Sequence, residues 1–196
     1  MFISFEGIDG SGKSTQIQLL KKYFQQNNKE VIVLREPGGT VLSELIRDLL
    51  LNKNLEITPQ SELLLFNAAR NDLLSKVIIP ALKEGKIVLC DRFFDSTLAY
   101  QSYGRGIDIE KVNYINDFST YSISPDLTFY LKIDLETSAK RNIDKRKDRI
   151  EKAGDDFFDR VKNGFDELSK KYNRIKTVDA NGTIDETHKL ILKLLK

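Results

Sequence analysis

Short apolar runs recur along the chain and alternate with longer segments in which apolar residues follow a helical period. The short runs are typical of buried strands, which we predict at Phe2 to Phe5, Glu30 to Leu34, Ile87 to Asp91, Asp126 to Ile133 and Ile175 to Val178. The longer segments predict helices that begin near Lys13 or span Val41 to Leu51, Pro59 to Leu82, Asp155 to Tyr172 and Ile184 to Leu195. Helical crossovers between apolar strands indicate an α/β fold, a five-stranded parallel sheet with helices on both faces.

The segment from Pro59 to Leu82 carries more apolar residues than a surface helix needs, because such a helix buries only one apolar stripe. Here they occupy more than one side: Leu63, Leu64, Leu65, Phe66, Leu73, Leu74, Val77, Ile78 and Ile79. The surplus predicts that the helix is also buried in a partner subunit. We therefore expect a homodimer through residues 59–82.

A glycine-rich stretch follows the first predicted strand and fits the phosphate-loop pattern G-x-x-x-x-G-K-[ST] at every fixed position. Glycines let several backbone N–H groups converge on a phosphate chain, and the next helix adds the positive end of its dipole. We expect Lys13 to reach the outer phosphates and the Ser14 hydroxyl to bind Mg²⁺. A chance Gly-rich turn is disfavoured by the position between a strand and a helix. The stretch predicts a P-loop NTPase, with phosphate-binding residues Gly7, Ile8, Asp9, Gly10, Ser11, Gly12, Lys13, Ser14 and Thr15.

Composition narrows the class of protein further. The chain has 196 residues, 40% hydrophobic and 31% charged, which suits one folded domain over residues 1–196. A net charge of +2 is too small to indicate nucleic acid or a membrane surface, and no apolar run approaches the length of a spanning helix. The single cysteine, Cys90, excludes an intrachain disulfide. We expect a cytoplasmic enzyme, with neither nucleic acid nor a membrane as partner.

Charged residues suited to phosphate follow the predicted strands at their carboxyl ends, where ligands bind in such sheets. Asp91 ends an apolar strand and is expected to hold Mg²⁺, directly or through water; an acid at a helix N-terminus is the alternative. Arg92 is placed to bind phosphate with both arms of its guanidinium. Arg141, Arg146 and Arg149 lie in a basic run whose composition is that of a solvated helix face, but its position opposite the phosphate loop favours phosphate.

Phe66 and Arg70 stand four positions apart on one face of the helix predicted for Pro59 to Leu82. An aromatic face beside an arginine suits a flat base, whose carbonyl oxygen the guanidinium would bind. Alone the pair is a weak indication, because such a phenylalanine more often belongs to the core.

Several motifs in one chain resemble the thymidylate kinase family. They are FEGIDGSGKST, REPGGT, LLFNAAR, DRFFDSTLAYQ with GRGI just after it, PDLTFYL and DRIE, in the family's order from about Phe2 to Asp179. The resemblance implies a nucleoside monophosphate kinase-like P-loop fold and a homodimer. It also implies an ATP:dTMP phosphotransferase that uses Mg²⁺ and makes dTDP for dTTP biosynthesis.

The resemblance further implies a role for each matching residue. Phe66 would stack on thymine, Arg70 would bind its carbonyl oxygen, and Tyr100 would pack on the sugar and exclude a ribose hydroxyl. The other residues of the dTMP site would be Asp9 at the 3′-hydroxyl, Arg92 and Arg47 at the phosphate, and Glu36, Thr97 and Gln101. Asn181 and Gly182 would border the adenine of ATP, with Arg141 stacked on it.

One position separates subgroups of this family. Some members carry an arginine directly after the acid of the phosphate loop, where this chain has Gly10. The resemblance then implies a catalytic arginine in the lid, about residues 141–153, with Arg149 the nearest motif match and Arg146 the alternative. The expected catalytic residues are Lys13, Asp9, Arg92 and Arg149, which would align the phosphoryl group and stabilise its charge.

Two other classes of protein remain open at this point. One is a kinase of the same fold that acts on deoxynucleosides or on other monophosphates. The other is a nucleotide-dependent switch, which is disfavoured because the guanine motif N-K-x-D is missing; Asn52 to Leu55 lacks its closing acid.

Overall fold

The core of the fold is a parallel sheet of five strands in the order β2-β3-β1-β4-β5. A computed structural model of the chain describes residues 1–142, 149–150 and 152–195. The strands are β1 (Phe2–Glu6), β2 (Val31–Arg35), β3 (Ile87–Asp91), β4 (Leu127–Lys132) and β5 (Ile175–Asp179). The predicted α/β fold is confirmed. β2 was expected to be buried, but Val31 to Leu34 are only half-buried, because β2 is an edge strand.

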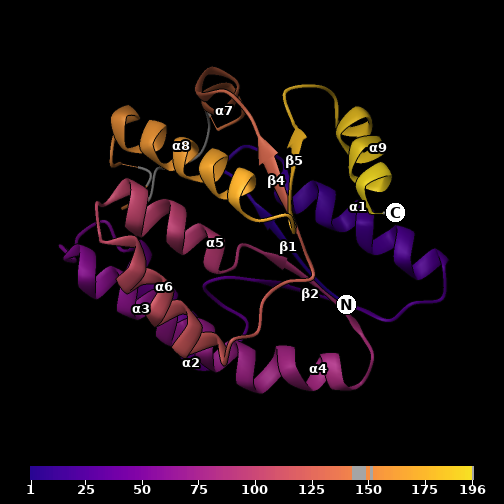
Figure 1. Cartoon of the computed structure of the whole chain (residues 1–196), viewed down its shortest axis with the longest axis horizontal. Helices are drawn as coiled ribbons and strands as arrows, with labels where there is room; N and C mark the ends of the chain where they lie inside the picture. The colour runs from indigo at the N-terminus through magenta and orange to yellow at the C-terminus, as the bar shows by residue number, and fades with distance from the viewer. Residues whose placement is uncertain (143–148, 151, 196) are drawn as a thin grey trace.

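Helices cover both faces of the sheet, as Figure 1 shows. One face carries α1 (Lys13–Gln26) and α9 (Ile184–Leu194), which lie side by side. The other face carries α8 (Asp155–Lys171), α5 (Phe94–Thr97) and the π-helical segment η2 (Leu98–Gly104). Farther out on that side, α3 (Pro59–Leu73) packs between α2 (Val41–Leu51) and α6 (Ile109–Thr120). A short helix, α7 (Leu135–Arg141), follows β4.

The long helical segment predicted for Pro59 to Leu82 is present but contains a π-helical turn. It consists of α3, η1 (Leu74–Ile78) and α4 (Ile79–Lys83). Pro80 has no N–H and its ring crowds the preceding turn, which accounts for the local departure from α-helical geometry. Most of its apolar surplus is used inside the chain: Leu63, Leu73, Leu74 and Ile78 are buried. Leu64 is exposed.

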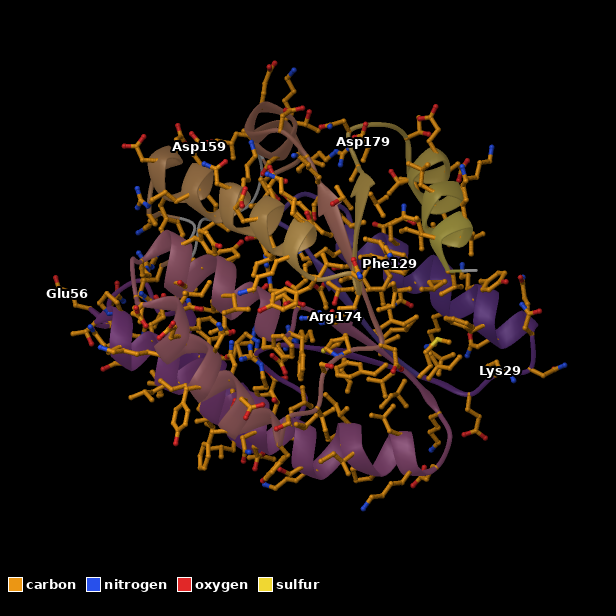
Figure 2. All side chains as sticks on the ribbon, viewed as in Figure 1. Lys29, Glu56, Phe129, Asp159, Arg174 and Asp179 are labelled. Carbon is orange, nitrogen blue, oxygen red and sulfur yellow. The ribbon has the colours of Figure 1, made fainter. Side chains whose placement is uncertain are left out.

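The helices between Phe94 and Thr120 were not predicted. Their apolar periodicity is masked because buried positions there hold polar side chains, among them Asp95, Thr97, Gln101 and Asn116. Elsewhere burial follows the usual pattern. Figure 2 shows Phe129 in the interior, while Lys29, Glu56 and Asp159 point outward from the rim of the molecule.

Candidate active site

Two adjoining cavities open at the carboxyl ends of the strands. The larger, of about 640 Å³, is lined by the phosphate loop from Asp9 to Thr15, by residues at the carboxyl ends of β2, β3 and β5, and by the last residue of α7. The smaller, of about 110 Å³, is lined mainly by side chains from α2, α3, α5 and η2. The side chains that line both are Asp9, Glu36, Arg47 and Arg92.

The phosphate loop holds its lysine against its own backbone. Lys13 Nζ donates to the carbonyl oxygens of Gly7 and Ile8, each at 3.1 Å, and burial lowers the pKa of this ammonium group. Gly7 and Ile8 therefore act from behind the loop and do not line the large cavity. Gly12 caps α1 with φ at 90°, a left-handed conformation that glycine adopts without strain.

Gly10 is closely covered by the segment after β4. A Cβ at this position would lie 2.7 Å from Asn142 Nδ2 and 3.0 Å from the Ser138 carbonyl oxygen, and φ is 77°. A side chain here would press on Asn142 and on the α7 backbone and would need a left-handed conformation, so the local packing favours glycine at this position.

Ser14 and Asp91 meet at the floor of the large cavity. The Ser14 hydroxyl donates to Asp91 Oδ2 at 3.0 Å, and both residues line the cavity. A hydroxyl and a carboxylate are hard oxygen donors, and Mg²⁺ is commonly held by one or two protein ligands together with substrate phosphates. The pair thus fits Mg²⁺. In the described part of the chain, no group of three or more acidic, histidine or cysteine side chains forms a fuller metal cage.

Arg92 stands between the two cavities in a strained conformation. Its φ of 72° is rare for a residue with a side chain, and such strain is often found at functional sites. Its guanidinium donates to Asp9 Oδ1 at 3.0 Å and to Ser96 Oγ, and lies 5.1 Å from the centre of the Tyr100 ring.

Sequence reasoning missed Glu6, which is linked to Arg92 through the Ser96 hydroxyl. Glu6 is buried and accepts hydrogen bonds from the backbone N–H of Phe93 and from the Ser96 hydroxyl. Burial, and after it the nearby Asp95 carboxylate, raise the pKa of Glu6 to about 8. An acid at the end of an apolar strand was the available signal.

The far end of the large cavity brings together the residues predicted to hold adenine. Arg141 donates to the carbonyl oxygens of Gly10 and Gly182, each at 3.2 Å, and of Asn181 at 3.4 Å. Arg141 and Gly182 line the large cavity, whereas Asn181 does not.

The large cavity has further lining residues that were not assigned to the ATP site from the sequence. They are Gln16, Arg35, Ala180, Thr183, Ile184 and Thr187.

The small cavity contains every residue predicted for dTMP: Asp9, Glu36, Arg47, Phe66, Arg70, Arg92, Thr97, Tyr100 and Gln101. They come from six separate parts of the chain, and the structure brings them to one place. The lining residues that were not predicted are Pro37, Leu51, Phe93, Ser96 and Ile150.

Arg70 is a buried arginine of the small cavity, 2% exposed. Its Nε donates to Glu36 at 2.7 Å, and its two terminal nitrogens donate to Thr97 at 2.8 Å and Asn116 at 3.2 Å. Burial raises the pKa of Glu36 to about 7, although the Arg70 charge opposes this. The second carboxylate oxygen of Glu36 has no hydrogen-bond partner among the described residues and is an acceptor available to a ligand.

Arg149 lies away from the phosphate loop. Its NH2 donates to Glu62 at 2.6 Å and its Nε donates to the Leu50 carbonyl oxygen at 2.8 Å. It does not line the large cavity. These contacts do not support the expectation that Arg149 faces the transferring phosphoryl group. Arg146, the alternative, lies outside the described residues.

Known proteins resemble this chain in sequence and in fold. The family described as thymidylate kinase matches residues 5–191. Relatives named thymidylate kinase include one from Kosmotoga olearia, 46% identical over 98% of this chain and 94% of its own length. Another, from Thermosipho africanus, is 49% identical over 94% and 92%. The crystal structure of thymidylate kinase from Ehrlichia chaffeensis matches with a TM-score of 0.83 and 37% identity over 100% of this chain and 98% of that one.

The parallel sheet, the phosphate loop and the second cavity define a P-loop enzyme of the nucleoside monophosphate kinase type. Within that class, the chain belongs to the thymidylate kinase family.

Proposed function

We propose that this enzyme transfers the γ-phosphoryl group of ATP to dTMP, with ATP in the large cavity and dTMP in the small one. The observation that carries the proposal is the common wall of Asp9, Glu36, Arg47 and Arg92. This common wall carries two arginines, Arg47 and Arg92, and adjoins the phosphate loop. Within the described cavities, it is the region that both substrates would reach. Alignment of two bound phosphates supplies much of the catalysis in such reactions.

Residues of the common wall and of the loop perform the transfer. Lys13 leaves the loop carbonyls to bind the outer phosphates of ATP, and Arg92 binds the acceptor phosphate with Arg47 beside it. Asp9 holds the Arg92 guanidinium and binds the sugar 3′-hydroxyl. Ser14 and Asp91 hold Mg²⁺, which when bound neutralises charge on the donor phosphates.

The remaining residues select the substrates. Phe66 stacks on thymine, Arg70 and Gln101 bind its polar edge, and Tyr100 packs on the sugar. Thr97 and Glu36 hold Arg70 in place, as their hydrogen bonds indicate. At the other end, Arg141 stacks on adenine above the Asn181–Gly182 backbone.

Gly10 leaves the loop without an arginine, so a lid arginine supplies the charge for the transferring phosphoryl group. Because Arg149 is bonded to Glu62 and Leu50, we assign this role to Arg146, the alternative offered by the sequence. In steady-state assays, Arg146→Ala should lower kcat by about 10³-fold or more, as loss of an arginine finger does in related enzymes. Unchanged kcat would remove Arg146 from the mechanism.

The enzyme is also proposed to be a cytoplasmic homodimer built from single-domain subunits of residues 1–196. The proposed dimer is supported by an exposed apolar face that extends beyond the helix predicted for Pro59 to Leu82 onto α2 and α6. The α2–α3–α6 face consists of Val41, Leu42, Leu45, Leu49, Leu64, Tyr114 and Phe118, all exposed. Exposed apolar patches of this kind mark interfaces. No helix in the described residues is long and apolar enough to cross a membrane.

Light scattering tests the dimer. The wild-type protein should give about twice the chain mass of 22.5 kDa, and Phe118→Asp should shift it toward the monomer. Tyr23→Ser, an exposed aromatic on α1, is the matched control and should remain dimeric. A wild-type monomer at micromolar concentration would overturn the dimer.

A coupled assay with ATP and Mg²⁺ tests the reaction itself. Turnover of dTMP should far exceed that of dCMP, dGMP or thymidine, because Phe66, Arg70 and Tyr100 together suit a thymine deoxynucleotide. Preference for another acceptor would identify a different kinase of this fold. ATP consumption that does not depend on any acceptor would indicate a nucleotide-dependent switch.

A further inference from the structure

Glu62 is a buried acid that the proposed phosphoryl transfer does not use. It lies in the first turn of α3, is fully buried, and both of its carboxylate oxygens are saturated. Oε1 accepts from Gln101 Nε2 at 2.9 Å and from Arg105 Nε at 3.1 Å. Oε2 accepts from Arg105 NH2 at 3.1 Å and from Arg149 NH2 at 2.6 Å. Two cations thus converge on one carboxylate.

Arg149 also binds the end of a second helix. Its Nε donates to the carbonyl oxygen of Leu50 at 2.8 Å, in the last turn of α2. Carbonyl oxygens in the last turn of a helix lack intrahelical partners and carry its negative dipole end, so an arginine there is favourable. Arg149 therefore ties its own segment to both α2 and α3.

This attachment places an apolar side chain at the acceptor cavity. Ile150, the next residue, lines the small cavity with Leu51 of α2 and Phe66 of α3. On the other side of the carboxylate, Glu62 holds the amide nitrogen of Gln101, so the amide oxygen is the atom left for a ligand. One carboxylate thus fixes two walls of the cavity.

We infer that Glu62 and Arg149 are positioning residues of the acceptor site: their ion pair anchors Ile150 against the bound base, and Glu62 orients Gln101. This rests on the proposed function, which places dTMP in the small cavity. An anchor of this kind strengthens binding of dTMP before and during transfer alike. It therefore changes dTMP affinity and leaves kcat nearly unchanged, whereas a charge acting on the transferring phosphoryl group changes kcat.

Steady-state kinetics and calorimetry on Arg149→Gln test the anchor. We expect the KM for dTMP and the Kd of dTMP alone to rise about tenfold, since a charge-assisted hydrogen bond is lost. The KM for ATP should stay unchanged and kcat should stay within about twofold. Arg149→Lys should recover part of the dTMP affinity, because lysine keeps the charge but not the planar group that reaches both Glu62 and Leu50. Lys152→Gln, an exposed cation three residues away, is the matched control and should match the wild type.

Two further variants separate the anchor from a general loss of structure. Ile150→Ala keeps the ion pair but shortens the wall, and should also raise the Kd of dTMP without lowering kcat. Glu62→Gln should likewise raise the Kd of dTMP without lowering kcat. If this variant fails to fold, Ile150→Ala still tests the anchor. Because wild-type turnover of dTMP tests the proposed function independently, the two ideas can fail separately. The anchor is overturned if Arg149→Gln loses kcat at unchanged dTMP affinity, or if it leaves both unchanged.

Discussion

The large cavity, which we propose as the donor site, and the small cavity, which we propose as the acceptor site, are built in different ways. The donor cavity is organised by one continuous stretch, the phosphate loop from Asp9 to Thr15, and its neighbours Arg35, Arg141 and Gly182 are exposed or half-buried. The acceptor cavity is lined by one stretch that runs from Arg92 through α5 into η2, and is closed by side chains from α2 and α3 and by the turn after β2. A phosphate chain can be bound by local backbone, whereas a base needs walls from separate elements.

The two cavities also differ in how their charges are held. On the acceptor side, buried Arg70 and Glu36 form an ion pair with each other, and buried Glu62 forms ion pairs with Arg105 and Arg149. Arg141 of the donor side is exposed and binds backbone carbonyl oxygens. Substitutions on the acceptor side should therefore disturb stability as well as binding, while those at the exposed donor rim should change binding alone.

Among the substitutions that compare the two cavities, the largest effect is expected at Lys13, the buried cation of the phosphate loop. Lys13→Ala removes the charge that the proposal brings to the outer phosphates of ATP, so kcat should fall by about 10²-fold or more. Steady-state kinetics with both substrates measures the loss. Lys22→Ala, an exposed lysine of the same helix, is the control and should behave as the wild type. Normal kcat in Lys13→Ala would mean that the loop amides alone hold the donor.

The next effect belongs to the acceptor side. Arg70→Gln leaves the base without its donor and leaves Glu36 without its ionic partner. Loss of a buried hydrogen bond costs about 1–3 kcal/mol, so the KM for dTMP should rise at least about tenfold while the KM for ATP hardly changes. Thermal unfolding should also shift to lower temperature. Lys76→Gln, which breaks an exposed pair with Asp72 on the same helical segment, should change neither quantity appreciably.

The same variant should acquire a new pH dependence of stability. Burial already raises the pKa of Glu36 from 4.5 to about 7 against the opposing charge of Arg70. Without Arg70 the folded-state pKa rises further, so the folded protein keeps a proton that the unfolded chain releases above pH 4.5. The free energy of unfolding must then fall as pH rises from about 5 to 8, more steeply than in the wild type. Urea titrations across this range measure the slopes, and equal slopes would contradict the burial argument.

The contrast between the cavities also explains what could be predicted from the sequence. Local patterns locate all five strands, the phosphate loop and the pair Ser14 and Asp91, because each depends on neighbours in the chain. The residues that line the small cavity were predicted from the family resemblance, because their spacing along the chain does not indicate that they lie together. Glu6 and Glu62 were missed because a buried acid is defined by partners that lie far away in the sequence.

Two predictions depend on partners that the local pattern does not identify. The apolar surplus of Pro59 to Leu82 predicts a partner subunit, which stays a prediction; within the chain, Leu73, Leu74 and Ile78 are buried, whereas Leu64 is exposed. Arg149 was placed at the phosphates by its motif, whereas Glu62 and Leu50 hold it at the acceptor side. In both cases the residue type indicates the kind of contact, but the partner of that contact lies far away in the sequence.

The smallest effect is expected at the exposed rim of the donor cavity. Among the described residues, Arg141 donates its hydrogen bonds to backbone carbonyl oxygens, and its proposed stacking on adenine takes place in contact with water. A cation–π contact at an exposed site contributes about 0.5–1 kcal/mol, so Arg141→Ala should raise the KM for ATP only about two- to fivefold. The KM for dTMP and the unfolding temperature should stay at their wild-type values, which is the reverse of Arg70→Gln. Lys140→Ala, which breaks an exposed pair with Glu136 on the same helix, controls for the loss of a positive charge. If Arg141→Ala instead raised the KM for dTMP, the donor and acceptor cavities would be coupled through α7 and Gly10, and the separation drawn between them would have to be abandoned.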